Sequence, residues 1–245
     1  MGNVTVITGG TSGIGRAIVE KIAEHSSEGD KIIVNYGHND QNARQLLISF
    51  EEELRSRIIL IREDLSKYEN IDPFCKKIKE KTDHIDWLVL NTGVGTYLPF
   101  EEYTFDLWDN IMRTNLSVPA FLIRELSELM AVNGNVILMA SHAGQVPYSS
   151  SVVYGVTKAG LIFLARTLVK VLEKRRVSIN AIAPGFIETR WQDGRSEESY
   201  ERINKKIALH RFGEPSEVAD LCWSVLNNDY LNGSVFEVHG GYNYF

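Results

Sequence analysis

NVTVITGGTSGIGRAIVEKIA, residues 3–23, places a short β-branched run, a glycine-rich turn and a helical pattern in direct succession. Glycines allow a tight turn and the close approach of a phosphate, while a helix N-terminus offers unpaired N–H groups and partial positive charge. The strand before and the helix after predict a dinucleotide pyrophosphate site, although the spacing is T-G-x-x-x-G-x-G rather than G-x-G-x-x-G. The residues that we expect to hold the nucleotide here are Gly9, Thr11, Ser12, Gly13, Ile14 and Gly15.

Strand-like and helix-like segments alternate along the rest of the chain. Further strands are predicted at 31–36, 57–61, 86–90, 135–140, 177–182 and 234–238, and helices at 40–55, 67–81, 105–130, 152–174, 197–208 and 215–227. Continuous apolar strands that alternate with helices indicate a parallel sheet covered on both faces. The sequence therefore predicts an α/β fold of the Rossmann type: a doubly wound, seven-stranded parallel sheet in three α/β/α layers. We expect one domain over residues 1–245.

The composition excludes several classes of function. The 245 residues carry a net charge of −6, which argues against a nucleic-acid surface. No uninterrupted run of eighteen apolar residues predicts a membrane span, and no secretory leader is visible at the start. The two cysteines are expected to be free thiols, and the six histidines show no ligand spacing, so we predict no metal site and a cytoplasmic location.

A possible proton-transfer group lies in the second half of the chain. Tyr154 and Lys158 are four residues apart in a predicted helix, so that they share one face. A nearby ammonium favours the phenolate and lowers the pKa of a tyrosine. Ser141, at the end of a predicted strand, could then hold a substrate oxygen. The alternatives are a solvated Tyr–Lys pair and a serine that caps the strand end.

Taken with the glycine turn, these residues resemble the short-chain dehydrogenase/reductase family, and in particular its 3-oxoacyl-[acyl-carrier-protein] reductase and glucose dehydrogenase types. The matching segments are Thr8-Gly9, Gly13-Ile14-Gly15, Asp64-Leu65, Asn91-Thr92-Gly93, Thr114-Asn115-Leu116, Ser141, Tyr154-x-x-x-Lys158, Asn180 to Gly185, Thr189, Arg211 to Pro215 and Gly240-Gly241. The resemblance implies an oxidoreductase that transfers a hydride between a nicotinamide cofactor and a carbonyl or alcohol.

The resemblance assigns roles to these positions. Tyr154 is the expected acid/base, Lys158 lowers its pKa and holds the nicotinamide ribose, Ser141 orients the substrate oxygen, and Asn115 tunes a local helix distortion. Without the resemblance, Asn115 could be an ordinary helical residue and Asp64 a helix N-cap. The remaining residues expected at the cofactor are Asp64 and Leu65 beside the adenine, Asn91, Thr92 and Gly93 after the fourth strand, and Pro184, Gly185, Ile187 and Thr189 after the sixth.

The chain also departs from the family pattern. Leu90 and Thr92 stand where relatives carry Asn and Ala, and His239 replaces an Asp near the end of the chain. Leu90 removes a hydrogen bond and Thr92 adds bulk beside the cofactor. Relatives with a similar tail form tetramers, so we expect a homotetramer or homodimer.

The end of the second strand predicts the cofactor type. A carboxylate there would accept a hydrogen bond from the ribose 2′-OH of NAD, but the strand ends Tyr36-Gly37-His38. No basic residue occupies Gly37 either, and Ser12 stands where many NADP-dependent members carry a base. With Tyr36 and His38 as the nearest polar groups, NADP is preferred and NAD remains open.

The first choice of substrate is a 3-oxoacyl thioester, and the alternative is a sugar, polyol or other small alcohol. Substrate contacts are expected from 94–100, 142–151 and a loop or lid over 186–207. Lys174-Arg175-Arg176 could dock an acyl-carrier protein or simply complement a helix dipole. A non-catalytic dinucleotide sensor is the remaining alternative, although such proteins usually lose the proton-transfer residues.

Overall fold

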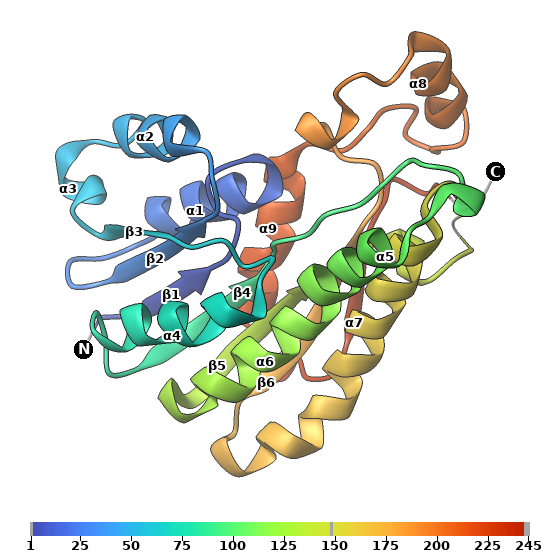
Figure 1. Cartoon of the computed structure of the whole chain (residues 1–245). Coiled ribbons are helices and arrows are strands. Elements are labelled where there is room, and N and C mark those ends of the chain that lie inside the picture. Colours follow the sequence, from blue (N-terminus) through green and yellow to red (C-terminus); the bar gives the residue numbers. More distant parts are fainter. Residues whose placement is uncertain (1, 148, 243–245) are drawn as a thin grey trace.

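A seven-stranded parallel sheet forms the centre of the molecule, with strand order β3-β2-β1-β4-β5-β6-β7 (Figure 1). The structure is a computed structural model, and it describes residues 2–147 and 149–242. The predicted doubly wound parallel sheet is confirmed. The strands are β1 (Val4–Ile7), β2 (Lys31–Tyr36), β3 (Ile58–Arg62), β4 (Ile85–Leu90), β5 (Met130–Met139), β6 (Ser178–Pro184) and β7 (Val235–Val238).

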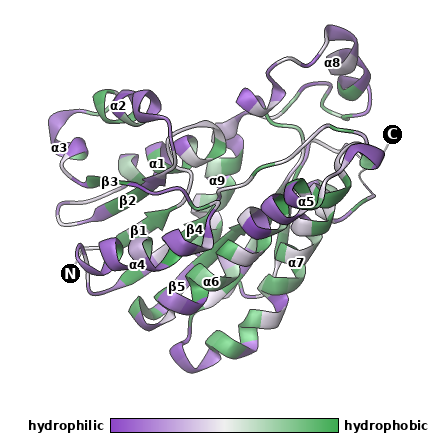
Figure 2. Ribbon diagram, viewed as in Figure 1, coloured by the Kyte–Doolittle hydropathy of each residue, from purple (hydrophilic) through white to green (hydrophobic). Residues whose placement is uncertain are grey.

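Helices cover both faces of this sheet, and their apolar sides point toward it (Figure 2). The helices are α1 (Gly13–Glu24), α2 (Asp40–Ile48), α3 (Glu52–Arg55), α4 (Ile71–Lys79), α5 (Phe105–Met112), α6 (Val118–Leu126), α7 (Val152–Leu172), α8 (Glu197–Asn204) and α9 (Pro215–Leu226). One core cluster joins the sheet to α4, α6 and α7, and a second joins it to α1 and α9. The two clusters give the predicted three layers.

The predicted helix over 40–55 is wrong as one element, because it is divided into α2 and α3. Ser49 ends α2, and its hydroxyl donates to the carbonyl of Leu46 at 2.7 Å. The guanidinium of Arg55 then donates to the carbonyls of Leu47 and Phe50. These side-chain donors satisfy carbonyls that would otherwise require the helix to continue.

The predicted helix over 105–130 is also interrupted. A π-helical turn at Arg113–Ser117 separates α5 from α6, and β5 already begins at Met130. Asn115 lies in the middle of this turn and is fully buried. Such π turns are often found at functional sites. The periodicity of a helix cannot show this insertion, because the apolar stripe continues through it.

The order of the strands changes direction between β1 and β4, because the chain adds β2 and β3 on one side of β1 and β4 to β7 on the other. This change leaves a crevice at the carboxyl ends of the strands. β1 pairs with both β2 and β4, so the connections that leave the carboxyl ends of β1 and β4 turn to opposite faces. Ligands of such sheets bind in this crevice. The glycine turn after β1, the segment after β4 and the residues after β5 and β6 all open into it.

Among the residues that the structure describes, one helix is long and apolar enough to cross a membrane by length and composition alone, namely α7 with its extension to Arg175. Its inner face packs on β5 and β6 and contributes Leu161 and Ala165 to the core. The same inner face buries Lys158. We interpret α7 as a core helix of the sandwich.

Candidate active site

The glycine turn has the geometry that a bound phosphate requires. Gly9 and Gly13 have φ values of 63° and 52°, which favour glycine. At Gly15, a Cβ atom would lie 2.2 Å from the carbonyl oxygen of Gly9, so no larger residue fits. Ser12 is the N-cap of α1 but makes no side-chain capping bond, which leaves its hydroxyl available to a ligand. The turn fits a dinucleotide pyrophosphate.

The segment after β4 is tied directly to this turn. The hydroxyl of Thr8 accepts hydrogen bonds from the N–H groups of Asn91 and Thr92, at 3.0 and 3.1 Å. The side chain of Asn91 donates to the carbonyls of Thr8 and Gly9. The hydroxyl of Thr92 is buried and has no partner within the described residues. This hydroxyl lies against the glycine turn, because a Cβ atom at Gly9 would come within 3.0 Å of its oxygen.

The residues expected at the adenine end lie outside the main cavity lining. Tyr36 donates to Asp40 at 3.1 Å, and His38 is largely exposed with Nε2 3.5 Å from Asp64. Burial opposes ionisation of Asp64, but hydrogen bonds from Ser66 outweigh it and hold the pKa of Asp64 below its usual value. The side chain of Leu65 is buried in the core.

Arg62 is a cation at this end that the sequence analysis missed. The parallel register of β2 and β3 places Arg62 beside Tyr36, and its guanidinium pairs with Asp40 at 3.1 Å. Only the pairing of the two strands reveals this neighbour, because the two residues are far apart in the sequence.

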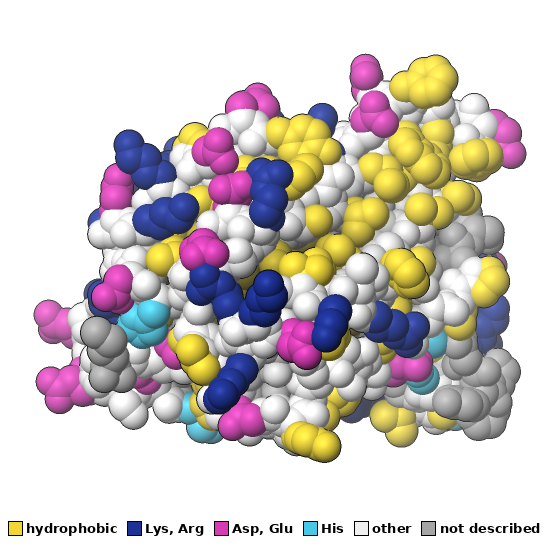
Figure 3. Space-filling model, turned by 90° about the horizontal axis from the view of Figure 1, so that it is seen from below, with side chains coloured by type: hydrophobic (Ala, Val, Ile, Leu, Met, Phe, Trp, Pro, Cys, Tyr) yellow, Lys and Arg dark blue, Asp and Glu magenta, His cyan; other side chains and the backbone are white. Residues whose placement is uncertain are grey.

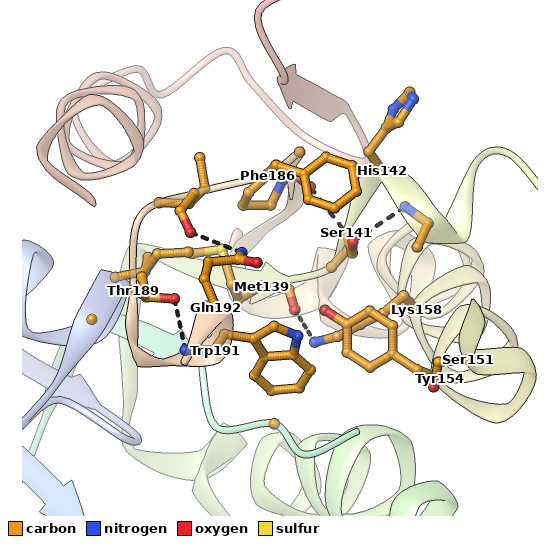
Figure 4. A pocket seen from close by; sticks show the side chains of 18 of the residues that line it. Met139, Ser141, His142, Ser151, Tyr154, Lys158, Phe186, Thr189, Trp191 and Gln192 are labelled. Atoms are coloured by element: carbon orange, nitrogen blue, oxygen red, sulfur yellow. Dashed lines mark hydrogen bonds between the residues drawn. The ribbon is translucent and has the colours of Figure 1, made fainter. Parts of the chain in front are cut away.

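Ser141, Tyr154 and Lys158 all line one cavity, which has a volume of about 550 Å³ (Figure 4). Ser141 follows β5, and its hydroxyl accepts a hydrogen bond from the N–H of Ala143 at 3.2 Å. Tyr154 and Lys158 come from the first two turns of α7, and Lys158 Nζ lies 5.4 Å from the centre of the Tyr154 ring. The two side chains therefore face the same space.

The ammonium of Lys158 is held beneath this cavity. It is 3% exposed and donates to the carbonyl of Met139 at 2.7 Å. Burial lowers the pKa of Lys158 from its ordinary value of 10.5 to about 8. The group thus remains mostly protonated at neutral pH, and its positive charge lies 5.4 Å from the centre of the Tyr154 ring.

Asn115 is not part of the cavity lining but clamps one of its walls. Its side-chain oxygen accepts from the N–H of Val94 at 2.8 Å, and its amide donates to the carbonyl of Val94 and to Thr157. Asn115 thereby fixes the segment after β4 against the π turn and α7. Its position in this structure is that of a positioning residue.

The segment after β6 supplies the opposite wall. Pro184, Gly185, Ile187 and Thr189 line the cavity. Trp191 packs against Tyr154 with ring centres 5.4 Å apart, and Figure 4 shows the indole beside the phenol. Trp191 belongs to the stretch that was expected to form a lid, but its contact with Tyr154 could not be foreseen from the sequence.

Most of the predicted residues converge on this cavity. The lining contains Gly9, Ser12, Gly13, Ile14, Gly15, Asn91, Thr92, Gly93, Ser141, Tyr154, Lys158, Pro184, Gly185, Ile187 and Thr189. The lining does not contain Thr11, Tyr36, His38, Asp64, Leu65 or Asn115. Tyr148, which falls within the predicted substrate segment 142–151, lies outside the described residues.

Comparison with known proteins agrees with this geometry. The profile of the family described as short chain dehydrogenase matches residues 3–199. The chain belongs to the short-chain dehydrogenase family. A 3-oxoacyl-[acyl-carrier-protein] reductase FabG of Aquifex aeolicus is 33% identical, over 98% of this chain and 97% of the relative. Glucose 1-dehydrogenase 2 of Bacillus subtilis is 29% identical, over 98% and 94%.

Solved structures show the same fold. A short-chain dehydrogenase/reductase from Serratia marcescens superposes with a TM-score of 0.89 at 23% identity, covering 99% of this chain and 98% of that one. The NADP active-site complex of Pseudomonas aeruginosa RhlG superposes with a TM-score of 0.87 at 25% identity, covering 98% and 96%. As a short-chain dehydrogenase, the protein is an oxidoreductase that uses a nicotinamide cofactor.

The residues that line the cavity fit that cofactor, and the side chains beside it have to position the substrate and exchange a proton with it. A bound nicotinamide supplies or accepts the hydride. We propose that the Tyr154 hydroxyl gives a proton to the substrate oxygen or removes one, and that the Ser141 hydroxyl, which lies 3.5 Å from the Pro184 carbonyl, turns to donate a hydrogen bond to the same oxygen. In the same proposal, the ammonium of Lys158 lies close enough to the Tyr154 ring to favour the phenolate, and Trp191 holds the ring in place.

The structure brings together three potential metal ligands that sequence spacing could not reveal. Donor atoms of His142, Glu237 and His239 lie within 4.8 Å of one another. His239 Nδ1 accepts from the N–H groups of Gly241 and Tyr242, so its proton lies on Nε2, which donates to Glu237 at 2.9 Å. This tautomer, assigned from the hydrogen-bond partners, leaves no lone pair on Nε2 for a metal. The cluster is a hydrogen-bonded one.

Replacing Lys158 with Met is expected to stabilise the protein without cofactor at pH 7. The pKa of Lys158, about 8 rather than 10.5, means that burying its charge costs the wild type about 3 kcal/mol of folding free energy. The variant avoids this cost. It loses about 1 kcal/mol in return, because the Met139 carbonyl no longer has a hydrogen-bond donor. Between about pH 8 and 10.5 the lysine is deprotonated in the folded state but still protonated in the unfolded state. The free energy of unfolding of the wild type should therefore rise over this range. The advantage of the variant should shrink over the same range.

Urea unfolding at pH 7 and pH 10 measures both effects. Lys174→Met, at an exposed position near the end of the same helix, is the matched control and should change little. A variant of Lys158 that is no more stable than the wild type at pH 7 would contradict the assigned pKa.

Proposed function

We propose that the protein is an NADP-dependent reductase whose first substrate class is 3-oxoacyl thioesters. The observation that carries the proposal is the convergence of Ser141, Tyr154 and buried Lys158 on one cavity at the mouth of the glycine turn. The Aquifex aeolicus relative, a 3-oxoacyl-[acyl-carrier-protein] reductase that matches the chain end to end, supports the substrate class. The aromatic lining by Tyr97, Phe186 and Trp191 also suits an apolar acyl group better than a polyol.

The preference for NADP rests on the charges at the end of β2. The carboxylate nearest to Tyr36 is Asp40, and Tyr36 and Arg62 already engage both of its oxygens. Asp40 is therefore poorly placed to receive the ribose 2′-OH of NAD. Arg62 and the exposed His38 are cations, or potential cations, beside the expected position of a 2′-phosphate.

A substrate panel read at the nicotinamide absorbance tests the proposal. Acetoacetyl thioesters, simple ketones, glucose and small polyols are offered with NADPH and NADH, or with NADP and NAD in the oxidative direction. We expect the largest kcat/KM for the 3-oxoacyl thioester and a lower KM for NADPH than for NADH. Faster oxidation of glucose would favour the alternative type, and a clear preference for NADH would overturn the cofactor assignment.

The segment 186–207 is proposed as a substrate lid that forms part of a single domain over residues 1–245. Ile203 and Ile207 of this segment form a small core cluster with Phe212, against which Phe186, Tyr200 and Tyr242 pack. Figure 1 shows α8 projecting from the main body above the end of the sheet. Because Phe212 and Tyr242 belong to this cluster, the segment is anchored to residues that follow it in the chain, as the base of a lid would be.

Self-association is proposed through α7, as a homodimer or homotetramer. Val156, Phe163 and Val171 lie on one face of α7 and are each exposed, and Phe105 on neighbouring α5 is 91% exposed. Exposed apolar faces of this kind mark protein interfaces. Mass measurement in solution by light scattering decides between monomer, dimer and tetramer.

Other partners have less support. Arg175 pairs with Glu128, so the basic run at 174–176 is partly neutralised as a docking site for an acyl-carrier protein. On the face shown in Figure 3, positive and negative side chains are interspersed, which does not suit nucleic acid. Cys75 and Cys222 are buried free thiols, in keeping with the proposed cytoplasmic location.

A further inference from the structure

The cavity is cationic although the protein as a whole is acidic. The chain has a net charge of −6, and positive and negative side chains are mixed on the outer face shown in Figure 3. Among the described residues that line the cavity, none is Asp or Glu, whereas Lys158, Arg190 and Arg195 all line it. A cavity of this composition favours anionic ligands.

Two of these cations already have a role or a partner. Lys158 is buried beneath Tyr154 and donates to the Met139 carbonyl. Arg190 lies 3.5 Å from the carboxylate of Asp193. Arg195 is the remaining cation of the lining, and within the described part of the chain it forms no ion pair.

Arg195 is held in a fixed orientation by neutral groups. Its Nε donates to Gln192 at 2.9 Å, and Nη1 donates to Ser199 at 3.0 Å. The guanidinium also lies over the rings of Tyr97 and Phe186, at 6.0 and 5.5 Å. A guanidinium has five N–H donors, so about three of them stay available to a ligand.

The hydrogen bonds extend from Arg195 to the wall where the nicotinamide is expected. Gln192, which orients Arg195, itself donates to the carbonyl of Ile187 at 3.0 Å. Arg195 therefore has a defined position relative to the Ile187–Thr189 wall. An arginine prepositioned by neutral partners and aromatic rings is suited to planar recognition of a carboxylate or phosphate.

We propose that Arg195 is a specificity-determining residue that binds an anionic group of the substrate, a carboxylate or a phosphate, while the carbonyl lies at Ser141 and Tyr154. This inference rests on the proposed reductase function. The anion could be part of a small oxo acid or the phosphate of a phosphopantetheine arm, and both present oxygens that an arginine fork can bind.

Paired substrates distinguish the two sources. Acetoacetate is compared with ethyl acetoacetate, and acetoacetyl-4′-phosphopantetheine with acetoacetyl-pantetheine, using NADPH as reductant. In at least one pair we expect the anionic member to have a KM about 10-fold or more lower, with a similar kcat. Arg195→Gln should abolish this difference by raising the KM of the anionic member only, and Arg195→Lys should restore part of it.

Arg202→Gln is the matched control, because Arg202 also contacts Ser199 on α8 but does not line the cavity. It should leave both pairs unchanged. Equal KM values within both pairs for the wild type, or an equal loss for neutral and anionic members in Arg195→Gln, would overturn the proposal.

A binding measurement separates this proposal from the proposed function. Calorimetric titration of the Tyr154→Phe protein with the same four compounds, in the presence of NADPH, reports affinity without turnover. One outcome is that the wild type reduces none of the four compounds, while the anionic member of a pair still binds more tightly than the neutral one and Arg195→Gln removes this difference in affinity. In that case the proposed reductase function is wrong and the anion site is supported. If neither anionic compound binds more tightly than its neutral partner, the anion site is wrong.

Discussion

Replacing Tyr154 with Phe is expected to lower kcat by about 10²–10⁴-fold while leaving the affinity for NADPH nearly unchanged. The substitution removes only the hydroxyl that exchanges a proton with the substrate oxygen. The ring remains, so its packing against Trp191 and its position above Lys158 should persist. Steady-state kinetics on the best substrate, together with NADPH binding by fluorescence, measure the two parts of the prediction.

Tyr230→Phe is the matched control, because the same atom is removed from a side chain that is 98% exposed. Its kinetics should equal those of the wild type. A Tyr154→Phe enzyme with unchanged kcat would show that another group transfers the proton, and would favour the interpretation of Tyr154 and Lys158 as a structural pair.

Replacing Gly15 with Ala is expected to weaken NADPH binding by about 100-fold or more. The new Cβ would lie 2.2 Å from the Gly9 carbonyl oxygen and 2.5 Å from Asn91 Nδ2, so the backbone of the turn must shift. That shift moves the N–H groups that we expect to bind the pyrophosphate. It also breaks the hydrogen bonds from the Asn91 side chain to the carbonyls of Thr8 and Gly9. The loss of stability should be about 1–3 kcal/mol, as for other overpacked sites.

Gly37→Ala provides the comparison, because a Cβ at Gly37 meets no atom within 4 Å. Because no atom has to move, this variant should lose no stability in urea, in contrast to Gly15→Ala. Circular dichroism and urea unfolding of Gly15→Ala show whether the variant is folded, so that lost binding can be assigned to the turn. A folded Gly15→Ala protein with normal NADPH affinity would mean that the turn does not hold the cofactor.

The fold could be predicted because its signals are local and repeated. The β-branched run before Gly9 and the helical pattern after Gly15 define one unit, and the alternation of such units favours a parallel sheet. The errors occurred where side chains interrupt a regular pattern. Arg55 and Ser49 end α2 early by bonding to its carbonyls, and Asn115 lies in a π turn that preserves the apolar stripe.

The candidate site could be predicted only in part. The residue types at Ser141, Tyr154 and Lys158 indicate proton transfer, because few other combinations activate a phenol next to a dinucleotide turn. No local pattern could indicate that Met139 would hold the ammonium, or that Arg62 would neutralise the carboxylate of Asp40 beside Tyr36. The first contact depends on the packing of α7 on β5, and the second on the pairing of β2 with β3, which places Arg62 beside Tyr36.

The sequence by itself determined the order of strands and helices, the glycine turn and the residue types of the candidate proton-transfer group, because each can be read from residues that are close in the chain. Only the tertiary structure decided the burial that lowers the pKa of Lys158, the packing of Trp191 on Tyr154 and the cationic cavity that contains Arg195. These properties arise from desolvation and from contacts between distant segments, and neither exists until the chain has folded.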